Sequence, residues 1–121
     1  MEQKYQHHLE SRGAQLSGND YVVFLRDFLG LLERKFHPNH SIVMRAKSGL
    51  ISSLGNVNGH FYHQLSDEGL RYKERLCRSF IEVFSKIDPG ASDWRGGTLY
   101  ELANTLTTIA QRYVLGLNLV A

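Results

Sequence analysis

The sequence predicts an all-α fold in which helices pair as antiparallel hairpins, and three observations support this. Apolar residues recur at gaps of three and four through most of the chain, the spacing that gathers them on one face of a helix. No stretch alternates apolar and polar residues as a half-buried strand would. Short breaker segments, His37-Pro38-Asn39-His40 and Asp88-Pro89-Gly90, separate periodic segments, so that each helix would turn back on the one before it.

Length and composition indicate one globular domain. The chain has 121 residues and a formal net charge of +2, too small for a general attraction to nucleic acid or to an anionic membrane. The single cysteine, Cys77, lies on an apolar stripe and is expected to be buried. One cysteine forms no internal disulfide and favours a reducing compartment, so we expect a cytoplasmic and/or nuclear protein. The polar start, Met1-Glu2-Gln3-Lys4, lacks the apolar region of a signal peptide.

The first hairpin is expected over residues 20–55, after a poorly structured or short helical segment at 1–18, where a helix over 2–10 would fit. Its first apolar stripe is Val22, Val23, Leu25, Phe28, Leu29, Leu32 and Phe36. Gly30 inside this helix costs ~1 kcal/mol against alanine, which suggests a close approach between helices. Pro38 suits the first turn of the next helix, and Gly55 suits its end. The second stripe is Ile42, Val43, Ala46, Leu50, Ile51 and Leu54.

The second hairpin is expected over residues 66–113, after a loop at 56–64. Ser66 suits a helix start, because its hydroxyl can accept hydrogen bonds from free backbone N–H groups. The two apolar stripes are Leu70, Cys77, Phe80, Ile81, Phe84 and Ile87, and then Leu99, Leu102, Ala103, Leu106, Ile109, Ala110 and Tyr113. We expect both stripes to be buried against each other and the rest of the chain. Residues 19–113 would then form a single helical domain, and residues 114–121 an apolar C-terminal tail.

The link between the helices of this second hairpin is the most specific local feature. Pro89 ends the first helix, Trp94 would cover the corner with a large apolar ring, and Arg95 could reach the free carbonyls of the preceding helix. The residues assigned to this structural corner are Asp88, Pro89, Gly90, Trp94, Arg95 and Gly96. They predict an architectural role and no catalytic one.

The histidines are the candidates for a metal site. His37 with His40, and His60 with His63, have the i, i+3 spacing that could offer zinc two imidazoles from each pair. Both pairs lie in corners or loops without an accompanying acid, so we interpret them as exposed loop histidines. There is also no Gly-rich phosphate loop. The sequence therefore predicts no catalytic, cofactor-binding or metal-binding residue and no cofactor.

A basic helix face offers a different function. Arg71, Arg75 and Arg78 share one face and could bind phosphates. Opposite charges four residues apart indicate instead a solvated face with weak ion pairs: Glu74–Arg78, Arg78–Glu82 and Glu82–Lys86. We favour the solvated face, and a small nucleic-acid-binding helical bundle is the less favoured alternative.

Several short segments across residues 20–113 carry a resemblance to a known family. They are Phe36-His37-Pro38-Asn39-His40, Gln64-Leu65-Ser66-Asp67-Glu68, Lys73-x-x-x-Cys77, Ile87-Asp88-Pro89-Gly90-Ala91-Ser92, Arg95-Gly96 and Leu99-Tyr100-Glu101-Leu102. Together they resemble the C-terminal helical region of arthropod SET-and-MYND-domain (SMYD) methyltransferases. The resemblance implies a tetratricopeptide-like bundle that lies beside a methyltransferase core, walls the substrate cleft and contacts partner proteins. The chain lacks the SET signature, the MYND zinc cluster and the post-SET cysteines, so no catalytic or cofactor residue is carried over.

These observations lead to the hypothesis of a non-catalytic helical protein-interaction module that resembles the SMYD C-terminal domain. Its partner would be a peptide or a neighbouring domain on the concave side between the hairpins, with Phe61 and Tyr62 as candidate contacts. We expect no nucleic-acid and no membrane partner. The alternative is a C-terminal fragment of an active SET-domain S-adenosylmethionine-dependent methyltransferase that contributes to the substrate cleft. If a catalytic core is the partner, an apolar surface patch should be exposed on this chain.

Overall fold

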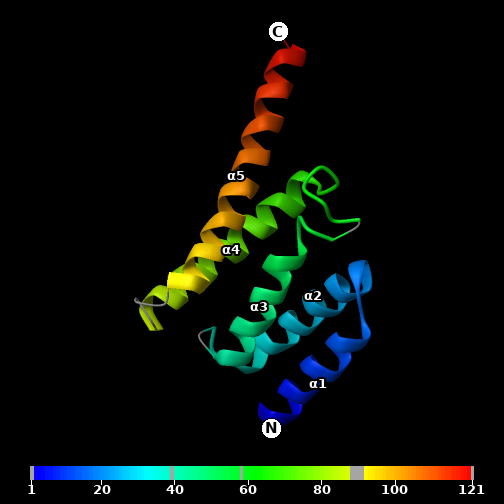
Figure 1. The fold of residues 1–121 in the computed structure, drawn as a ribbon, viewed down its shortest axis with the longest axis vertical. Coiled ribbons are helices and arrows are strands. Elements are labelled where there is room, and N and C mark those ends of the chain that lie inside the picture. The colour runs from blue at the N-terminus through cyan, green and yellow to red at the C-terminus, as the bar shows by residue number, and fades with distance from the viewer. Residues whose placement is uncertain (1, 39, 58, 88–91, 121) are drawn as a thin grey trace.

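The computed structural model describes the backbone of residues 2–38, 40–57, 59–87 and 92–120 and the side chains of 3–38, 40–57, 59–86 and 97–116. Within these ranges the helices are α1 (Glu2–Gln15), α2 (Gly18–Lys35), α3 (Ser41–Ser53), α4 (Asp67–Ile87) and α5 (Ser92–Val120), as Figure 1 shows. The same ranges contain no β-strand, only an isolated parallel bridge between Gly55 and Phe61. The predicted all-α fold is confirmed.

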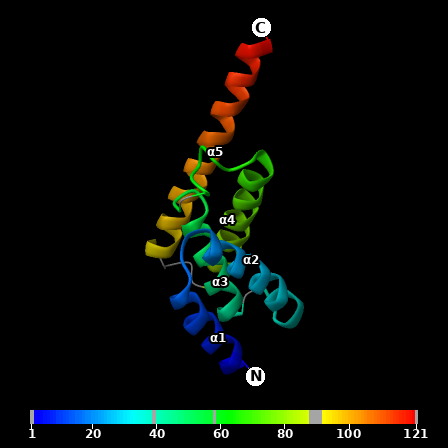
Figure 2. The ribbon, with the colours of Figure 1, turned by 90° about the vertical axis from the view of Figure 1, so that its right-hand side faces the viewer.

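The helices are arranged around α3, which contacts α1, α2, α4 and α5. α2 packs with α3, and α4 packs with α5, as expected of two successive hairpins. α4 lies along α5 as far as Arg112, which pairs with Asp67 at the start of α4, whereas the C-terminal end of α5 extends beyond the other helices in both views (Figures 1 and 2). In the described part of the chain, none of these helices combines the length and hydrophobicity needed to cross a membrane.

The first helix, α1, is longer than the short helix expected near the N-terminus. Leu9 is buried, and the ring of Tyr5 lies 6.3 Å from that of Phe28 in α2. Apolar and aromatic contacts therefore hold a helix whose sequence is otherwise polar. The chain turns from α1 into α2 at Gly18, whose φ of 60° lies in the left-handed region that glycine adopts without steric cost.

The α2–α3 hairpin supplies much of the core, as predicted. Its buried apolar residues are Val22, Leu25, Phe28, Leu29 and Leu32 from α2 and Ile42, Val43, Met44, Ala46, Leu50 and Ile51 from α3. Val23 was expected on this stripe but is exposed. It follows Val22 directly, and consecutive helical residues point about 100° apart, so the two cannot share the narrow side that faces α3.

The close approach of α2 and α3 lies at Gly49, so the expectation for Gly30 was wrong. A Cβ atom on Gly30 would meet no heavy atom within 4 Å. A Cβ atom on Gly49 would lie 2.9 Å from Cδ1 of Leu25 and 3.2 Å from the hydroxyl of Tyr21. The glycine that leaves space for side chains of the facing helix is therefore on α3.

The ends of α3 differ in how well the sequence predicted them. The helix begins at Ser41, so Pro38 does not lie in its first turn as expected. His40 takes the N-cap position instead, and its Nδ1 accepts a hydrogen bond from the backbone N–H of Ile42 at 3.3 Å. At the other end Gly55 follows the C-cap residue with φ of 96°, the conformation expected of a glycine that ends a helix.

The predicted corner between α4 and α5 cannot be compared with the fold. Asp88, Pro89 and Gly90, together with the side chains of Trp94, Arg95 and Gly96, lie outside the residues that the structure describes. The role assigned to these residues stays a prediction.

The two helices of the second hairpin bury different kinds of side chain. α4 buries Leu70, Cys77 and Phe80, as predicted. The prediction for α5 was wrong for Leu99, Leu106 and Tyr113, which are exposed, whereas Leu102 and Ile109 pack against the core as expected. Among the described side chains of α5, the buried ones are Thr98 and Thr105. α4 presents a lysine to α5 among its apolar residues, so the facing side of α5 has to be polar.

Candidate functional site

A buried lysine joins α5 to the rest of the bundle. Lys73 lies on α4 between Leu70 and Cys77, and its side chain has no exposed surface. Taking an ammonium group out of water is costly unless its N–H donors are matched by acceptors and its charge by a counter-charge. The three donors of Lys73 therefore decide what must lie around it.

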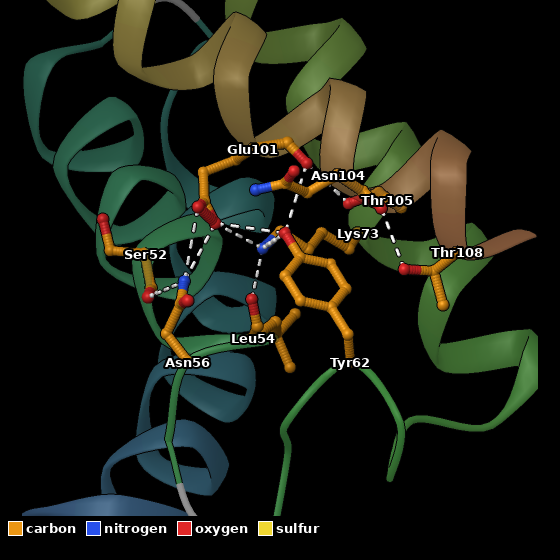
Figure 3. A network of polar contacts seen from close by, with 9 residues as sticks. All are labelled: Ser52, Leu54, Asn56, Tyr62, Lys73, Glu101, Asn104, Thr105 and Thr108. Atoms are coloured by element: carbon orange, nitrogen blue, oxygen red, sulfur yellow. Dashed lines mark hydrogen bonds and ion pairs between the residues drawn. The ribbon is translucent and has the colours of Figure 1, made fainter.

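The ammonium group of Lys73 has three acceptors from three parts of the fold (Figure 3). Nζ donates to Oε1 of Glu101 in α5 at 2.9 Å and to the hydroxyl of Tyr62 at 2.8 Å. It also donates to the backbone carbonyl of Leu54, at the end of α3. Nζ lies 4.6 Å from the centre of the Tyr62 ring, which adds a cation–π contact. All three donors are satisfied.

The carboxylate of Glu101 extends this network toward the surface. It accepts a hydrogen bond from Nδ2 of Asn56 at 2.9 Å, and Asn56 also donates to the carbonyl of Ser52 at 3.0 Å (Figure 3). Within α5 the hydroxyl of Thr105 donates to the carbonyl of Glu101 at 2.8 Å. The network thus connects the end of α3, the loop after it, α4 and α5.

Burial shifts the pKa of three groups here, Lys73, Tyr62 and Cys77. It lowers the pKa of Lys73, although the hydrogen bond and the negative charge of Glu101 oppose the shift. It raises the pKa of Tyr62, and it raises that of the Cys77 thiol to about 11. Lys73 is sealed from solvent with every donor engaged, so the arrangement acts as a polar anchor between helices.

A second polar contact holds α5 to the bundle closer to the C-terminus of this helix, at Arg112. Nη1 of Arg112 lies 3.0 Å from Oδ1 of Asp67, at the start of α4, and Nη2 donates to the carbonyl of Tyr62 at 3.1 Å. Arg112 and Glu101 therefore both point toward the bundle. The side of α5 that faces the bundle consists largely of Thr98, Glu101, Thr105, Thr108 and Arg112, with Leu102 and Ile109 at its border.

The opposite side of α5 is apolar and exposed. Its large apolar residues are between 37% and 68% exposed: Leu99, Tyr100, Leu106, Tyr113 and Val114. Ala103 and Ala110 lie among them and are exposed too. We call the surface formed by these seven residues the outer face of α5. An ordinary surface helix has its apolar side toward the core, so α5 has the reverse orientation.

A groove between the two hairpins begins beside this face. It has a volume of about 460 Å³ and is lined by Ser48, Ile51, Ser52, Asn56, Gly97, Thr98, Tyr100 and Glu101. The groove lies between α3 and α5, on the side where the sequence suggested a recognition surface. Tyr100 belongs to both the groove and the outer face, so the two surfaces are continuous.

The two aromatic residues expected in the loop between hairpins have different environments. Phe61 is exposed and stacks on the ring of His63, with 5.9 Å between ring centres. Tyr62 is half-buried and belongs to the network around Lys73. A Cβ atom on Gly55 would lie 2.6 Å from the Tyr62 ring, so the glycine leaves the space that the ring occupies.

The histidine pairs and the basic face have surroundings of their own. His60 Nε2 lies 2.7 Å from Oδ1 of Asn19. Among the residues that the structure describes, no group of three or more His, Cys, Asp or Glu side chains is placed to hold a metal ion. On α4 Glu74 pairs with Arg71 at 2.9 Å and, as predicted, with Arg78 at 3.0 Å. The two arginines are exposed, which is typical of a solvated face.

Sequence reasoning missed both Lys73 and Glu101 as partners. A signal was present, because the stripe of α4 leaves a gap of seven residues between Leu70 and Cys77, and Lys73 fills the missing position. Comparison of the chain with protein-family models, with curated proteins and with solved structures finds no match.

Proposed function

We propose that this chain is a non-catalytic helical protein-interaction module that binds through the outer face of α5. The observation that carries the proposal is the reversed orientation of this helix. Polar contacts hold the inner side of α5 to the bundle, and its apolar side faces the solvent. Contiguous apolar surface on a folded protein marks an interaction site more often than chance would give.

The resemblance to the SMYD C-terminal region supports the same proposal, because in that family the helical region contacts other parts of the protein and partner proteins. A tetratricopeptide-like role and a cytoplasmic or nuclear location belong to this proposal as well. The single cysteine, which is buried, is in keeping with a reducing compartment.

Photo-crosslinking inside cells tests the proposal directly. A photoreactive phenylalanine analogue would replace Tyr113 on the outer face, and in a matched variant it would replace Arg78 on the solvated face of α4. Both positions are exposed. We expect a discrete protein adduct from position 113 and none from position 78. Equal adduct patterns at the two positions, or no adduct at position 113, would remove the basis of the proposal.

A second candidate function uses the same observation. An exposed apolar patch is what a C-terminal module of a SET-domain methyltransferase would present to its catalytic core. Titration calorimetry of this chain with S-adenosylmethionine separates the two candidates. Measurable binding of the methyl donor by this chain would favour the methyltransferase and overturn the non-catalytic module.

A further inference from the structure

We propose that the outer face of α5 pairs with the same face of a second copy of this chain, in an antiparallel two-helix coiled coil. The inference rests on the proposed function, since it names the partner of that surface. Four features of α5 carry it: the spacing of its apolar residues, the alternation of their sizes, the absence of charge among them, and the shape of the molecule.

The spacing along the outer face follows a strict heptad. Leu99, Ala103, Leu106, Ala110 and Tyr113 succeed one another at gaps of four, three, four and three residues, and the sequence continues the pattern at Leu117 and Val120. A heptad with two apolar positions forms the seam of a coiled coil, in which each side chain inserts between side chains of the facing helix. The first five of these residues are exposed, so this seam is unoccupied by the described part of the fold.

The sizes alternate along the seam, and this sets the direction of the partner. Large residues occupy one heptad position, at Leu99, Leu106 and Tyr113, and alanines occupy the other, at Ala103 and Ala110. In a parallel pair of identical helices, equivalent positions meet, so alanine would face alanine across a gap and tyrosine would face tyrosine. In an antiparallel pair the two heptad positions meet each other, so Leu106 and Tyr113 can each face an alanine, which fills space evenly.

A two-fold axis level with residue 108 pairs the seam over its whole length from residue 99 to residue 117. It sets Leu106 opposite Ala110 of the second copy, Ala103 opposite Tyr113 and Leu99 opposite Leu117. The same axis repeats these contacts with the copies exchanged, as a closed dimer requires. Self-complementarity of this kind is a property of the seam itself and needs no second sequence.

Charge favours the same occupant. Between residues 99 and 116 the charged side chains are Glu101 and Arg112, and both are engaged on the inner side of α5, with Lys73 and with Asp67. A self-pair through the outer face therefore brings no like charges together and buries no unpaired charge. The same face offers no charge pattern that would select an acidic or basic partner.

The shape of the molecule leaves room for the second helix. The C-terminal end of α5 extends beyond the other helices (Figures 1 and 2). With the axis level with residue 108, the projecting end of each copy lies over the N-terminal part of α5 in the other copy. The seam from residue 99 to residue 116 is about 27 Å long at 1.5 Å per residue, five helical turns.

Sedimentation of the purified full chain, with matched variants, tests the pairing. We expect a species of twice 13.8 kDa at micromolar concentration. Leu106→Glu places a carboxylate in the seam and should raise the dissociation constant roughly a hundredfold or more. Gln111→Glu adds the same charge on the same helix outside the seam and should leave the mass unchanged. A wild-type chain that stays monomeric at high micromolar concentration, or a dimer that Leu106→Glu leaves intact, would overturn the inference.

Disulfide trapping tests the direction and does not disturb the seam. Thr107 flanks the seam next to the axis, so Thr107→Cys should form a covalent dimer on mild oxidation. Tyr100→Cys lies far from the axis and should not link to itself, but it should link to a Val114→Cys chain mixed with it. A dimer of Tyr100→Cys with itself that forms faster than that of Thr107→Cys would overturn the antiparallel arrangement.

These results separate this inference from the proposed function. If the chain alone is monomeric while position 113 crosslinks to a different protein in cells, the interaction module stands and self-pairing is wrong. If position 113 gives no adduct and the chain is monomeric, both are wrong.

Discussion

Replacing Glu101 by glutamine tests whether α5 is held by its charge pair with Lys73. Glutamine has nearly the shape of glutamate and keeps an acceptor oxygen, so the change removes the counter-charge and little else. Nζ of Lys73 would then be left with two neutral acceptors besides the amide, the Leu54 carbonyl and the Tyr62 hydroxyl. The buried ammonium must either stay charged without a counter-charge or give up its proton.

Each of these two states of Lys73 limits how much free energy of unfolding the substitution can remove. Removing one partner of a buried ion pair costs about 3–5 kcal/mol. Deprotonation sets a ceiling, because neutralising a lysine of ordinary pKa 10.5 at pH 7 costs about 5 kcal/mol at about 1.36 kcal/mol per pKa unit. The Glu101 side chain is 15% exposed, so water already screens part of the attraction. We expect the free energy of unfolding to fall by about 2–4 kcal/mol.

The loss of stability in Glu101→Gln should also depend on pH, in a direction that the pKa of Lys73 determines. Burial lowers the pKa of Lys73 in the folded state, so the unfolded state binds more protons and stability rises with pH up to the ordinary pKa of 10.5. Without the charge of Glu101 the pKa of Lys73 falls further, and the cost at low pH grows. The deficit of Glu101→Gln should therefore be largest near pH 7 and shrink as the pH is raised toward 10.

Urea unfolding followed by far-UV circular dichroism, at one protein concentration and at pH 7, 8.5 and 10, measures this deficit. Glu82→Gln is the matched control, because Glu82 pairs with Lys86 at 3.4 Å on the same helix as Lys73 but with both side chains largely exposed. The control should change stability by less than about 0.5 kcal/mol at each pH. The reasoning is refuted if Glu101→Gln costs no more than the control, or if its cost does not depend on pH.

Three further substitutions or measurements follow from burial and backbone geometry. The thiol of Cys77 is fully buried, and burial raises its pKa to about 11, so at pH 8 a disulfide reagent should label it roughly a thousandfold or more slowly in the folded chain than in denaturant. Gly30→Ala meets no neighbour within 4 Å in a helix interior and should raise the free energy of unfolding by about 0.5–1 kcal/mol. Gly55→Ala, at φ of 96° and with its Cβ 2.6 Å from the Tyr62 ring, should lower it by more than about 1 kcal/mol. Urea unfolding checks both glycines, and equal effects would contradict the assignment.

The first hairpin was predictable because it follows the commonest rule. Leu25, Leu32 and Leu50 recur at helical spacing and are buried, so apolar period alone located the core of α2 and α3. The details that failed depend on geometry between helices. Periodicity shows which face a residue is on, but which glycine makes room for side chains of the facing helix, Gly30 or Gly49, is set by where the helices cross.

The second hairpin was half predictable. The stripe of α4 was identified, but Lys73, which lies on it between Leu70 and Cys77, was not included, although a lysine at a core position is a signal for a buried partner. α5 carries two periodic stripes on opposite sides, one apolar and one made of Thr98, Glu101, Thr105 and Arg112. Sequence alone favours burial of the apolar stripe, and only the position of Lys73 on the facing helix reverses that choice.

The balance of energies explains why α5 faces inward with its polar side. Turning the helix so that Leu99 and Leu106 face α4 would bury apolar side chains worth about 1.5–3 kcal/mol each when fully buried, but these residues are already partly covered, and Leu102 and Ile109 would lose their contacts in exchange. The turn would also strip the Lys73 ammonium of its counter-charge, at about 3–5 kcal/mol. The exchange of leucines and isoleucine roughly cancels and the loss of the ion pair does not, so the buried lysine of α4 determines that the heptad seam of α5 faces away from the described part of the bundle.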